Sequence, residues 1–239
     1  MSALLWKTDS SSPPWPDFWC SAVNRIITLD GPAGVGKSTI ARSVAEHCCI
    51  AYLDTGAMFR IIAKTLGREK VNLPEAELAG KFTALSFSLS GTGEATILAC
   101  NGVSAGQDIR TEAVGKLASD YATKPIVRQF LKKAQQDLGK AYSLVAEGRD
   151  MGTAVFPDAP HKFFLDASPE VRALRRVRQL AENGIIEDVA TVTQQIRERD
   201  EQDRNRPIAP LKAADDALII DTSAKDITQV LQTILAALE

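Results

Sequence analysis

The sequence predicts an α/β fold: a doubly wound, five-stranded parallel sheet flanked by helices. Five short apolar runs show little alternation, which is typical of strands covered on both faces. They span residues 25–29, 50–53, 143–146, 162–165 and 217–220. Helical patterns lie between or after them, at residues 37–48, 56–66, 110–138, 169–182, 188–204 and 225–238. This strand-helix alternation indicates that ligands would gather at the carboxyl ends of the strands.

A glycine-rich decapeptide, DGPAGVGKST, follows the first predicted strand. It contains the complete P-loop pattern, Gly31-x-x-x-x-Gly36-Lys37-Ser38, between a strand and a helix. Backbone N–H groups of such a loop surround a phosphate, and the helix N-terminus adds a positive dipole. We therefore expect an ATP site in which Lys37 reaches the β and γ phosphates and the Ser38 hydroxyl binds Mg²⁺. The loop residues assigned to this site are Gly31, Pro32, Ala33, Gly34, Val35, Gly36, Lys37, Ser38 and Thr39. The alternative is a glycine-rich turn that only joins strand to helix.

The second predicted strand leads into DTGAMFR, residues 54–60. Thr55 is a suitable helix cap, and Arg60 lies little more than one turn inside the predicted helix. Both positions should lie near the P-loop in a doubly wound sheet. Arg60 could therefore hold a second phosphate that faces the first, although a solvated helix arginine has the same local pattern.

Residues 85–103 interrupt the alternation of strands and helices. Leu85, Phe87 and Leu89 alternate with serines, a second apolar run follows at residues 95–100, and the dipeptide Asn101-Gly102 favours a type I′ hairpin. We expect a small antiparallel sheet within an insert spanning about residues 67–142. The core would then consist of about residues 23–66 and 143–239.

Arginine and aspartate also follow the third predicted strand, as Arg149-Asp150 between glycines. The flanking glycines permit a sharp turn that approaches a ligand closely. A surface loop held by a salt bridge is the alternative. Arg110 begins the predicted helix after the meander, where it could lie over the site or only cap the helix.

The segment of residues 197–206 has four basic and four acidic side chains, so attraction to a polyanion is not its role. Helical spacing places Arg199, Asp203 and Arg206 on one face. This face could line the site, although a helix with exposed ion pairs would have the same composition.

Arg172, Arg175 and Arg176 share a face of the predicted helix that starts at Ser168-Pro169. The dipeptide Asn183-Gly184 then offers a break at which a short helical lid, about residues 172–187, could bend. An ordinary basic helix face is the alternative.

Composition limits the possible partners. The 239 residues include 28 basic and 30 acidic side chains, and a formal net charge of −2 does not favour a nucleic acid polymer. The four cysteines lack the spacing of zinc sites or of a disulfide framework. No segment has the roughly 20 apolar residues of a membrane span, and residues 1–22 lack the pattern of a signal peptide. We expect a disordered extension at 1–22 and a cytoplasmic, monomeric protein without membrane or nucleic acid partners.

The motifs together resemble the bacterial cytidylate kinases, a family of P-loop nucleoside monophosphate (NMP) kinases. The similar blocks are LDGPAGVGKST, YLDTGAMFR, IRTEAV, AEGRDMGTAVFPDAPHKFFLDAS and ERDEQDRNRPIAPLKAADDALIIDTS, in order over residues 24–239. The resemblance implies transfer of the γ-phosphoryl group of ATP to CMP or dCMP, with Mg²⁺. It also implies that the insert is an NMP-binding subdomain.

The resemblance further implies roles for individual residues. Lys37, Arg60, Arg149 and Arg206 would be catalytic, and the three arginines would hold the acceptor phosphate. Arg175 would bind ATP. The remaining CMP contacts would be Thr55, Ser104, Arg110, Asp150, Arg199 and Asp203. Two departures from the family pattern are a longer VSAGQDIR segment around Ser104 and Arg110, and Gln202 in place of a familiar arginine.

Two other classes of function fit a P-loop. One is a kinase of another small metabolite, such as shikimate or dephospho-coenzyme A. The other is a nucleotide-binding switch that signals to a protein partner, although the guanine-binding Asn-Lys-x-Asp run is absent from the sequence. The preference between CMP and dCMP, and any use of UMP, is left open by the residues.

Overall fold

The computed structural model describes residues 25–182 and 184–238. The predicted extension at 1–22 therefore lies outside the described residues, as does Asn183 of the predicted bend at Asn183-Gly184. The predicted five-stranded parallel sheet is confirmed, with the strand order β2-β6-β1-β7-β8. Its strands are β1 (Ile26–Asp30), β2 (Ala51–Asp54), β6 (Leu144–Gly148), β7 (His161–Asp166) and β8 (Leu218–Asp221).

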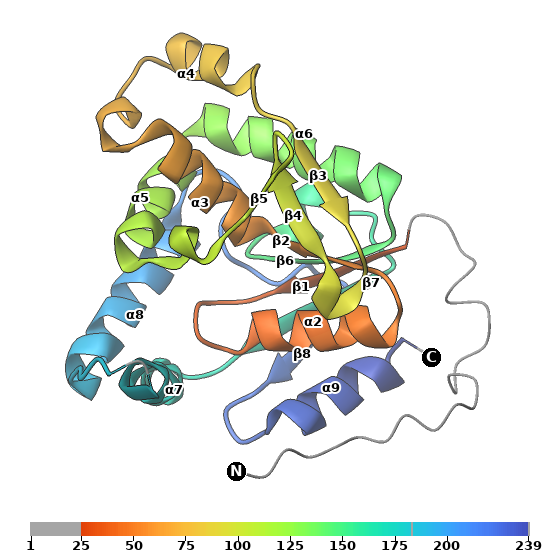
Figure 1. The fold of residues 1–239 in the computed structure, drawn as a ribbon. Helices are drawn as coiled ribbons and strands as arrows, with labels where there is room; N and C mark the ends of the chain where they lie inside the picture. Colours follow the sequence, from red (N-terminus) through yellow and green to blue (C-terminus); the bar gives the residue numbers. More distant parts are fainter. Residues whose placement is uncertain (1–24, 183, 239) are drawn as a thin grey trace.

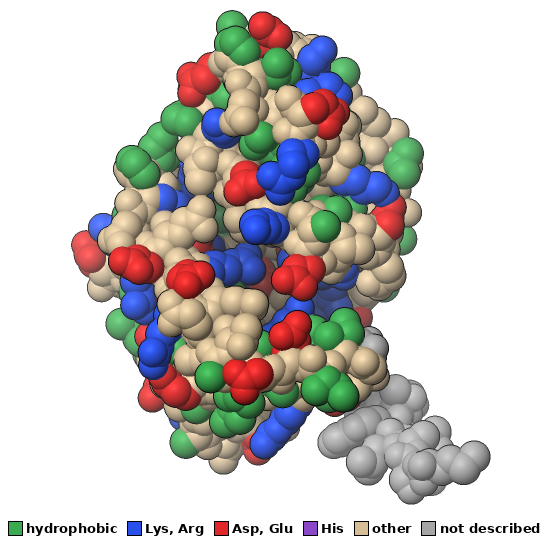
Figure 2. Space-filling model, turned by 90° about the vertical axis from the view of Figure 1, so that its left-hand side faces the viewer, with side chains coloured by type: hydrophobic (Ala, Val, Ile, Leu, Met, Phe, Trp, Pro, Cys, Tyr) green, Lys and Arg blue, Asp and Glu red, His purple; other side chains and the backbone are tan. Residues whose placement is uncertain are grey.

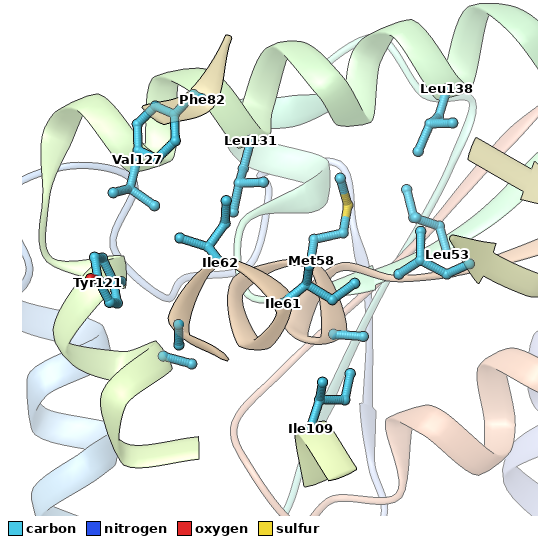
Figure 3. Packing of buried hydrophobic residues seen from close by; sticks show 14 of the residues in the cluster. Leu53, Met58, Ile61, Ile62, Phe82, Ile109, Tyr121, Val127, Leu131 and Leu138 are labelled. Carbon is cyan, nitrogen blue, oxygen red and sulfur yellow. The ribbon is translucent and has the colours of Figure 1, made fainter. Parts of the chain in front are cut away.

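Helices cover both faces of this sheet (Figure 1). On one face, α2 (Lys37–His47) and α9 (Ile227–Ala236) pack against side chains such as Leu29 and Val145. On the other, α3 (Thr55–Leu66) packs against α6 (Pro125–Ala141) and β2. Figure 3 shows Met58 and Ile62 of α3 directed toward α6. Because both faces of the sheet are buried, its polar groups reach a ligand at the ends of the strands.

The predicted antiparallel meander is also confirmed. Its strands are β3 (Phe87–Ser90), β4 (Ile97–Cys100) and β5 (Val103–Ser104), in that spatial order. Asn101 and Gly102 have φ values of 50° and 77°, as a type I′ turn requires. The meander is tied to the core through β2, because Thr96 Oγ1 accepts a hydrogen bond of 3.1 Å from the backbone N–H of Tyr52. A helix that the sequence analysis did not identify, α4 (Glu75–Phe82), precedes the meander.

The predicted helix at 110–138 is wrong in one respect, because the structure divides it into α5 (Glu112–Ala122) and α6. Pro125 cannot donate a backbone hydrogen bond, and it favours an extended conformation at Lys124, whose φ and ψ are −82° and 122°. The start also differs from the prediction: Arg110 lies in a short 3₁₀ turn (Gln107–Arg110), and Thr111 caps α5 by accepting a hydrogen bond from Val114 N.

The cap of α3 also differs from the prediction. Asp54 caps this helix by accepting a hydrogen bond of 2.9 Å from Ala57 N, whereas Thr55 is the first helical residue. The Thr55 hydroxyl donates to the backbone oxygen of Glu147 at 2.6 Å. Thr55 does not cap the helix because it is buried, at 3% exposed, and its hydroxyl is turned toward β6.

Two further helices, α7 (Pro169–Glu182) and α8 (Val189–Asn205), pack against each other at one side of the sheet (Figure 1). The lid predicted at about residues 172–187 would begin within α7 and end before α8. Throughout the described parts of the chain, no helix combines the length and the apolar character needed to cross a membrane.

Candidate functional site

A cleft of about 720 Å³ opens at the carboxyl ends of β2 and β6 and beside the P-loop. Figure 2 shows a hollow in one face of the molecule with basic side chains gathered around it. Most predicted site residues line the cleft: Ala33, Gly34, Gly36, Lys37, Ser38, Thr39, Thr55, Arg60, Arg110, Arg149, Asp150, Arg175, Arg199, Asp203 and Arg206. Segments far apart in the sequence therefore converge on one strongly basic site, as the doubly wound fold predicts.

Four predicted residues do not line this cleft: Gly31, Pro32, Val35 and Ser104. Three of them belong to the P-loop, but they are buried beneath it and do not face the cleft. A Cβ atom on Gly31 would lie 2.1 Å from the backbone oxygen of Leu165, so only glycine fits against β7. Val35 is buried in the core. Ser104 is different, because it is an exposed residue of β5.

Lys37 is buried at the first turn of α2, and its Nζ donates to the backbone oxygen of Pro32 at 2.6 Å. Burial lowers the pKa of Lys37 well below its usual value, and Arg149 lowers it further, whereas Glu147 and Asp30 oppose this change. Lys37 thus lies among the charges that surround the P-loop. This placement suits a cation that neutralises phosphate oxygens.

Glu147, near the end of β6, was not selected from the sequence. One of its carboxylate oxygens accepts a hydrogen bond of 2.8 Å from Ser38 Oγ, and the other accepts one of 2.5 Å from the hydroxyl of Tyr52. Burial, and then the nearby Asp54, raise the pKa of this carboxyl. Its position could have identified it from the sequence, because an acidic residue at the carboxyl end of a strand in this fold lies at the edge of the sheet where ligands bind.

Asp30 is a second buried carboxyl that was missed. It accepts hydrogen bonds from the backbone N–H groups of Met151 and Gly152, at 2.9 and 2.8 Å. Burial raises its pKa to about 6. These bonds anchor the π-helical turn Met151–Val155 to the residue before the P-loop. Asp30 therefore supports the turn that presents Arg149 and Asp150.

Asp150 joins two arginines across the cleft. One of its oxygens accepts a hydrogen bond of 3.1 Å from Arg206, and the other accepts one of 2.6 Å from Arg128 of α6. Arg128 was missed by the sequence analysis, although it lies on the buried face of α6, together with apolar residues such as Leu131 and Leu138. A charged residue at such a position is rarely buried without a partner, and that pattern was the available signal.

A second ion pair connects the residue after β6 with α8. Arg149 Nε donates to a carboxylate oxygen of Asp203 at 3.0 Å. Burial by itself would raise the pKa of Asp203, but Arg149 and Arg199 outweigh it and lower the pKa. Arg199 faces the open cleft; partial desolvation there, and then Arg149, lower its pKa to about 10. The predicted face of Arg199, Asp203 and Arg206 does line the site.

Arg60 and Arg110 each contact a neighbouring group of the protein. Arg60 donates from Nη1 to the backbone oxygen of Ile109 at 3.2 Å, and burial lowers its pKa. Arg110 forms an ion pair of 3.1 Å with Asp54. Both arginines line the cleft, and Gln202 lines it as well.

The arginines of α7 were predicted to share one face, but Arg172 is buried whereas Arg175 lines the cleft. Arg172 is 1% exposed, forms a two-pronged ion pair with Asp200, and donates to the backbone oxygen of Ala33 at 3.1 Å. Arg175 lines the cleft and donates to the Thr222 hydroxyl and backbone oxygen. Arg172 therefore fixes α7 to the P-loop.

Comparison with known proteins agrees with this arrangement. A model of the family described as Cytidylate kinase matches residues 27–239. The chain belongs to the cytidylate kinase family. It is 56% identical over 214 residues to Cytidylate kinase of Oleidesulfovibrio alaskensis, covering 90% of this chain and 98% of that protein. Identity to Cytidylate kinase of Lawsonia intracellularis is 47%, with 88% and 93% of the two chains covered. Membership of this family makes the chain an ATP-dependent phosphotransferase.

Proposed function

We propose that this protein transfers the γ-phosphoryl group of ATP to CMP or dCMP, giving CDP or dCDP. The observation that supports this most directly is the shared cleft, which is lined by Lys37 of the P-loop and by Arg60, Arg149 and Arg206. Two phosphate-binding sets in one cleft suit two nucleotides that meet at their phosphates. Such an enzyme would act in cytoplasmic pyrimidine nucleotide metabolism.

Recognition of the acceptor nucleoside is assigned to the part of the cleft around Asp150. Asp150 is held by Arg128 and Arg206, and a cytosine offers both donors and acceptors to such groups. Ser119 of α5 lines this cleft, whereas Ser104 does not. We therefore assign Ser119 and Arg128 to the cytosine side in place of Ser104, together with Asp203, Arg199, Thr55 and Arg110.

The donors at the P-loop fit Mg²⁺. Ser38 Oγ and the Glu147 carboxylate are hard oxygen donors 2.8 Å apart. In the described residues, no group of three or more His, Cys, Asp or Glu side chains is arranged to hold a metal ion. A site with few protein ligands suits Mg²⁺, which keeps waters and takes ligands from substrate phosphates. When bound, the ion would neutralise charge on the β and γ phosphates.

Catalysis in this cleft would rest on alignment and charge neutralisation, because a phosphate oxygen needs no strong base to attack. Lys37 would hold the donor phosphates, and Arg60, Arg149 and Arg206 would hold the acceptor phosphate in line. Planar guanidinium groups suit the second task because they bind phosphate through two parallel hydrogen bonds. Arg175 would lie on the ATP side.

Exclusion of water is assigned to the region that follows Arg172. Water competes with CMP for the phosphoryl group, so the cleft should close only around both substrates. Since Arg172 is bound to Asp200 and to the P-loop, the closing part would begin beyond it and reach to about residue 187. Gly184, with a φ of 76°, is a position at which the chain turns.

The decisive test is a coupled assay of ADP release with CMP, dCMP, UMP, AMP and shikimate as acceptors. We expect the highest kcat/KM with CMP or dCMP. A higher value with shikimate would instead support a kinase of another small metabolite. Slow ADP release that does not respond to any acceptor would support a nucleotide-binding switch.

A further inference from the structure

Tyr52 has a buried hydroxyl that no proposed step has yet used. It lies in β2, its side chain is almost fully buried, and its hydroxyl donates to Glu147 Oε2 at 2.5 Å. The other oxygen, Glu147 Oε1, accepts the hydrogen bond from Ser38 Oγ. Within residues 25–182 and 184–238, these two hydroxyls are the hydrogen-bond donors to this carboxylate. One carboxylate thus connects Tyr52 to the P-loop serine.

The direction of these hydrogen bonds matters for the Ser38 oxygen. A serine hydroxyl has one proton and two lone pairs. When the Ser38 hydroxyl donates its hydrogen bond to Glu147, both lone pairs of Oγ stay free for a cation or another donor. When the carboxylate turns away, the proton can point toward the phosphate site and oppose a cation there.

Tyr52 is itself firmly placed. Its backbone N–H donates to Thr96 Oγ1 of the insert, and the Arg42 guanidinium of α2 lies 5.2 Å from the centre of its ring. An arginine over a tyrosine ring is an attractive arrangement. The backbone bond fixes the chain at Tyr52, and the buried ring cannot move without breaking its contact with Arg42, so the hydroxyl is held in place as a donor.

We propose that Tyr52 is a positioning residue for the magnesium-nucleotide complex: its hydroxyl fixes the Glu147 carboxylate, which orients Ser38 Oγ with its lone pairs toward the P-loop. The proposal rests on the proposed use of MgATP. It assigns Tyr52 no contact with substrate and no part in CMP recognition.

The test compares Tyr52→Phe with Tyr121→Phe. Both variants lose one buried hydroxyl, but the hydroxyl of Tyr121 donates to the backbone oxygen of Gly67 at 2.7 Å, in the α3–α5 packing. Calorimetric titration gives the dissociation constant of ADP with Mg²⁺ and with EDTA. We expect Tyr52→Phe to reduce the gain in affinity from Mg²⁺ by about three- to tenfold. This is less than the full effect of a hydrogen bond to a charged group, because Tyr52 acts on Ser38 only through Glu147. The EDTA value should not change, and Tyr121→Phe should retain the full gain.

A double variant separates positioning from packing. If Tyr52 acts through Glu147, then adding Tyr52→Phe to Glu147→Gln should change the Mg²⁺-dependent gain much less than it does in the wild type. In steady-state assays, Tyr52→Phe should raise the Mg²⁺ concentration needed for half-maximal rate by the same factor and leave the KM of CMP unchanged. An unchanged Mg²⁺-dependent gain in Tyr52→Phe, or full additivity in the double variant, would overturn the proposal.

The ADP titrations also separate this inference from the proposed function. Wild-type protein that binds ADP with a Mg²⁺-dependent gain but does not phosphorylate CMP or dCMP would refute the proposed acceptor, and the Tyr52 comparison would still be decided. Melting temperatures of the two tyrosine variants check that each is folded at the titration temperature.

Discussion

Asp203 is the residue at which acceptor binding can be separated most cleanly from ATP binding. It lines the cleft from α8 and pairs with Arg149, one of the arginines proposed to hold the acceptor phosphate. We expect Asp203→Ala to weaken CMP by about ten- to a hundredfold, the cost of roughly 1.5–3 kcal/mol for one charge-assisted contact. The affinity for ATP should change by less than about threefold.

Titration of CMP and ATP into the Asp203→Ala variant gives both dissociation constants. Asp137→Ala is the matched control, because that carboxylate forms exposed ion pairs on α6 with Lys133 and Lys140. It should leave both affinities unchanged. Equal losses for CMP and ATP would assign Asp203 to the scaffold instead.

Asp30 allows a pH prediction with a definite sign. Its pKa is about 6 in the folded protein, against 3.8 for an exposed aspartate, because burial disfavours the carboxylate. The folded state therefore binds the proton more tightly. The resulting stability is fully present below pH 3.8 and is lost as the pH rises through about 6. Two pKa units correspond to about 3 kcal/mol.

Urea unfolding of the wild type and of Asp30→Asn between about pH 4 and pH 7 measures this effect. The free energy of unfolding of the wild type should fall relative to that of Asp30→Asn by up to about 3 kcal/mol across this range. The variant is the reference because its amide does not titrate. Parallel pH profiles of the two proteins would show that Asp30 keeps an ordinary pKa.

At the scale of the elements, α7 and α8 are joined by two ion pairs of very different burial. Arg172 and Asp200 are nearly inaccessible, whereas Arg197 and Glu170 are both more than half exposed. We expect Arg172→Ala to lower the free energy of unfolding by about 3–5 kcal/mol, because it leaves the buried Asp200 charge unpaired. Arg197→Ala should cost less than about 1 kcal/mol.

Urea unfolding of the two variants at pH 7 makes the comparison, since each removes one arginine from the same helix pair. Similar losses for both would mean that the buried pair does not stabilise the packing of α7 on α8. A large loss confined to Arg172→Ala would assign this buried arginine to the packing of α7 on α8.

Local patterns carried most of the information about these elements. The five strands, the meander and its type I′ turn followed from runs of apolar residues and from Asn101-Gly102. The break between α5 and α6 was predictable from Pro125 but was hidden by continuous helical periodicity on both sides. The cap of α3 depended on burial of Thr55 against β6, a tertiary effect that the local pattern does not contain.

At the scale of the whole molecule, the missed residues share one property: their partners are distant in the sequence. Asp30 binds backbone groups at Met151 and Gly152, and Glu147 joins Ser38 to Tyr52. Pattern and resemblance located the P-loop and the arginines, because those have local motifs. Which buried acids connect them depends on strand order, and β6 lies between β1 and β2 although it is far from both in sequence.

The whole cleft, rather than any one element, should determine how ATP is used. In the proposed function the P-loop would supply one set of phosphate ligands, and Arg60 of α3, Arg149 after β6 and Arg206 after α8 would supply the other. With ATP alone the second set has no acceptor phosphate to align, so water is a poorly positioned competitor. We expect ADP release from ATP without CMP to be slower by roughly a hundredfold or more than with saturating CMP.

A coupled assay of ADP release, run with and without CMP at saturating MgATP, measures this ratio. Arg60→Lys provides the internal comparison, because a lysine keeps the charge but cannot form two parallel hydrogen bonds to the acceptor phosphate. Its rate with CMP should fall by about tenfold or more while its rate without CMP stays the same. If wild-type protein released ADP equally fast in both conditions, the second set of arginines would not serve an acceptor, and the two-nucleotide cleft would be the wrong description of this site.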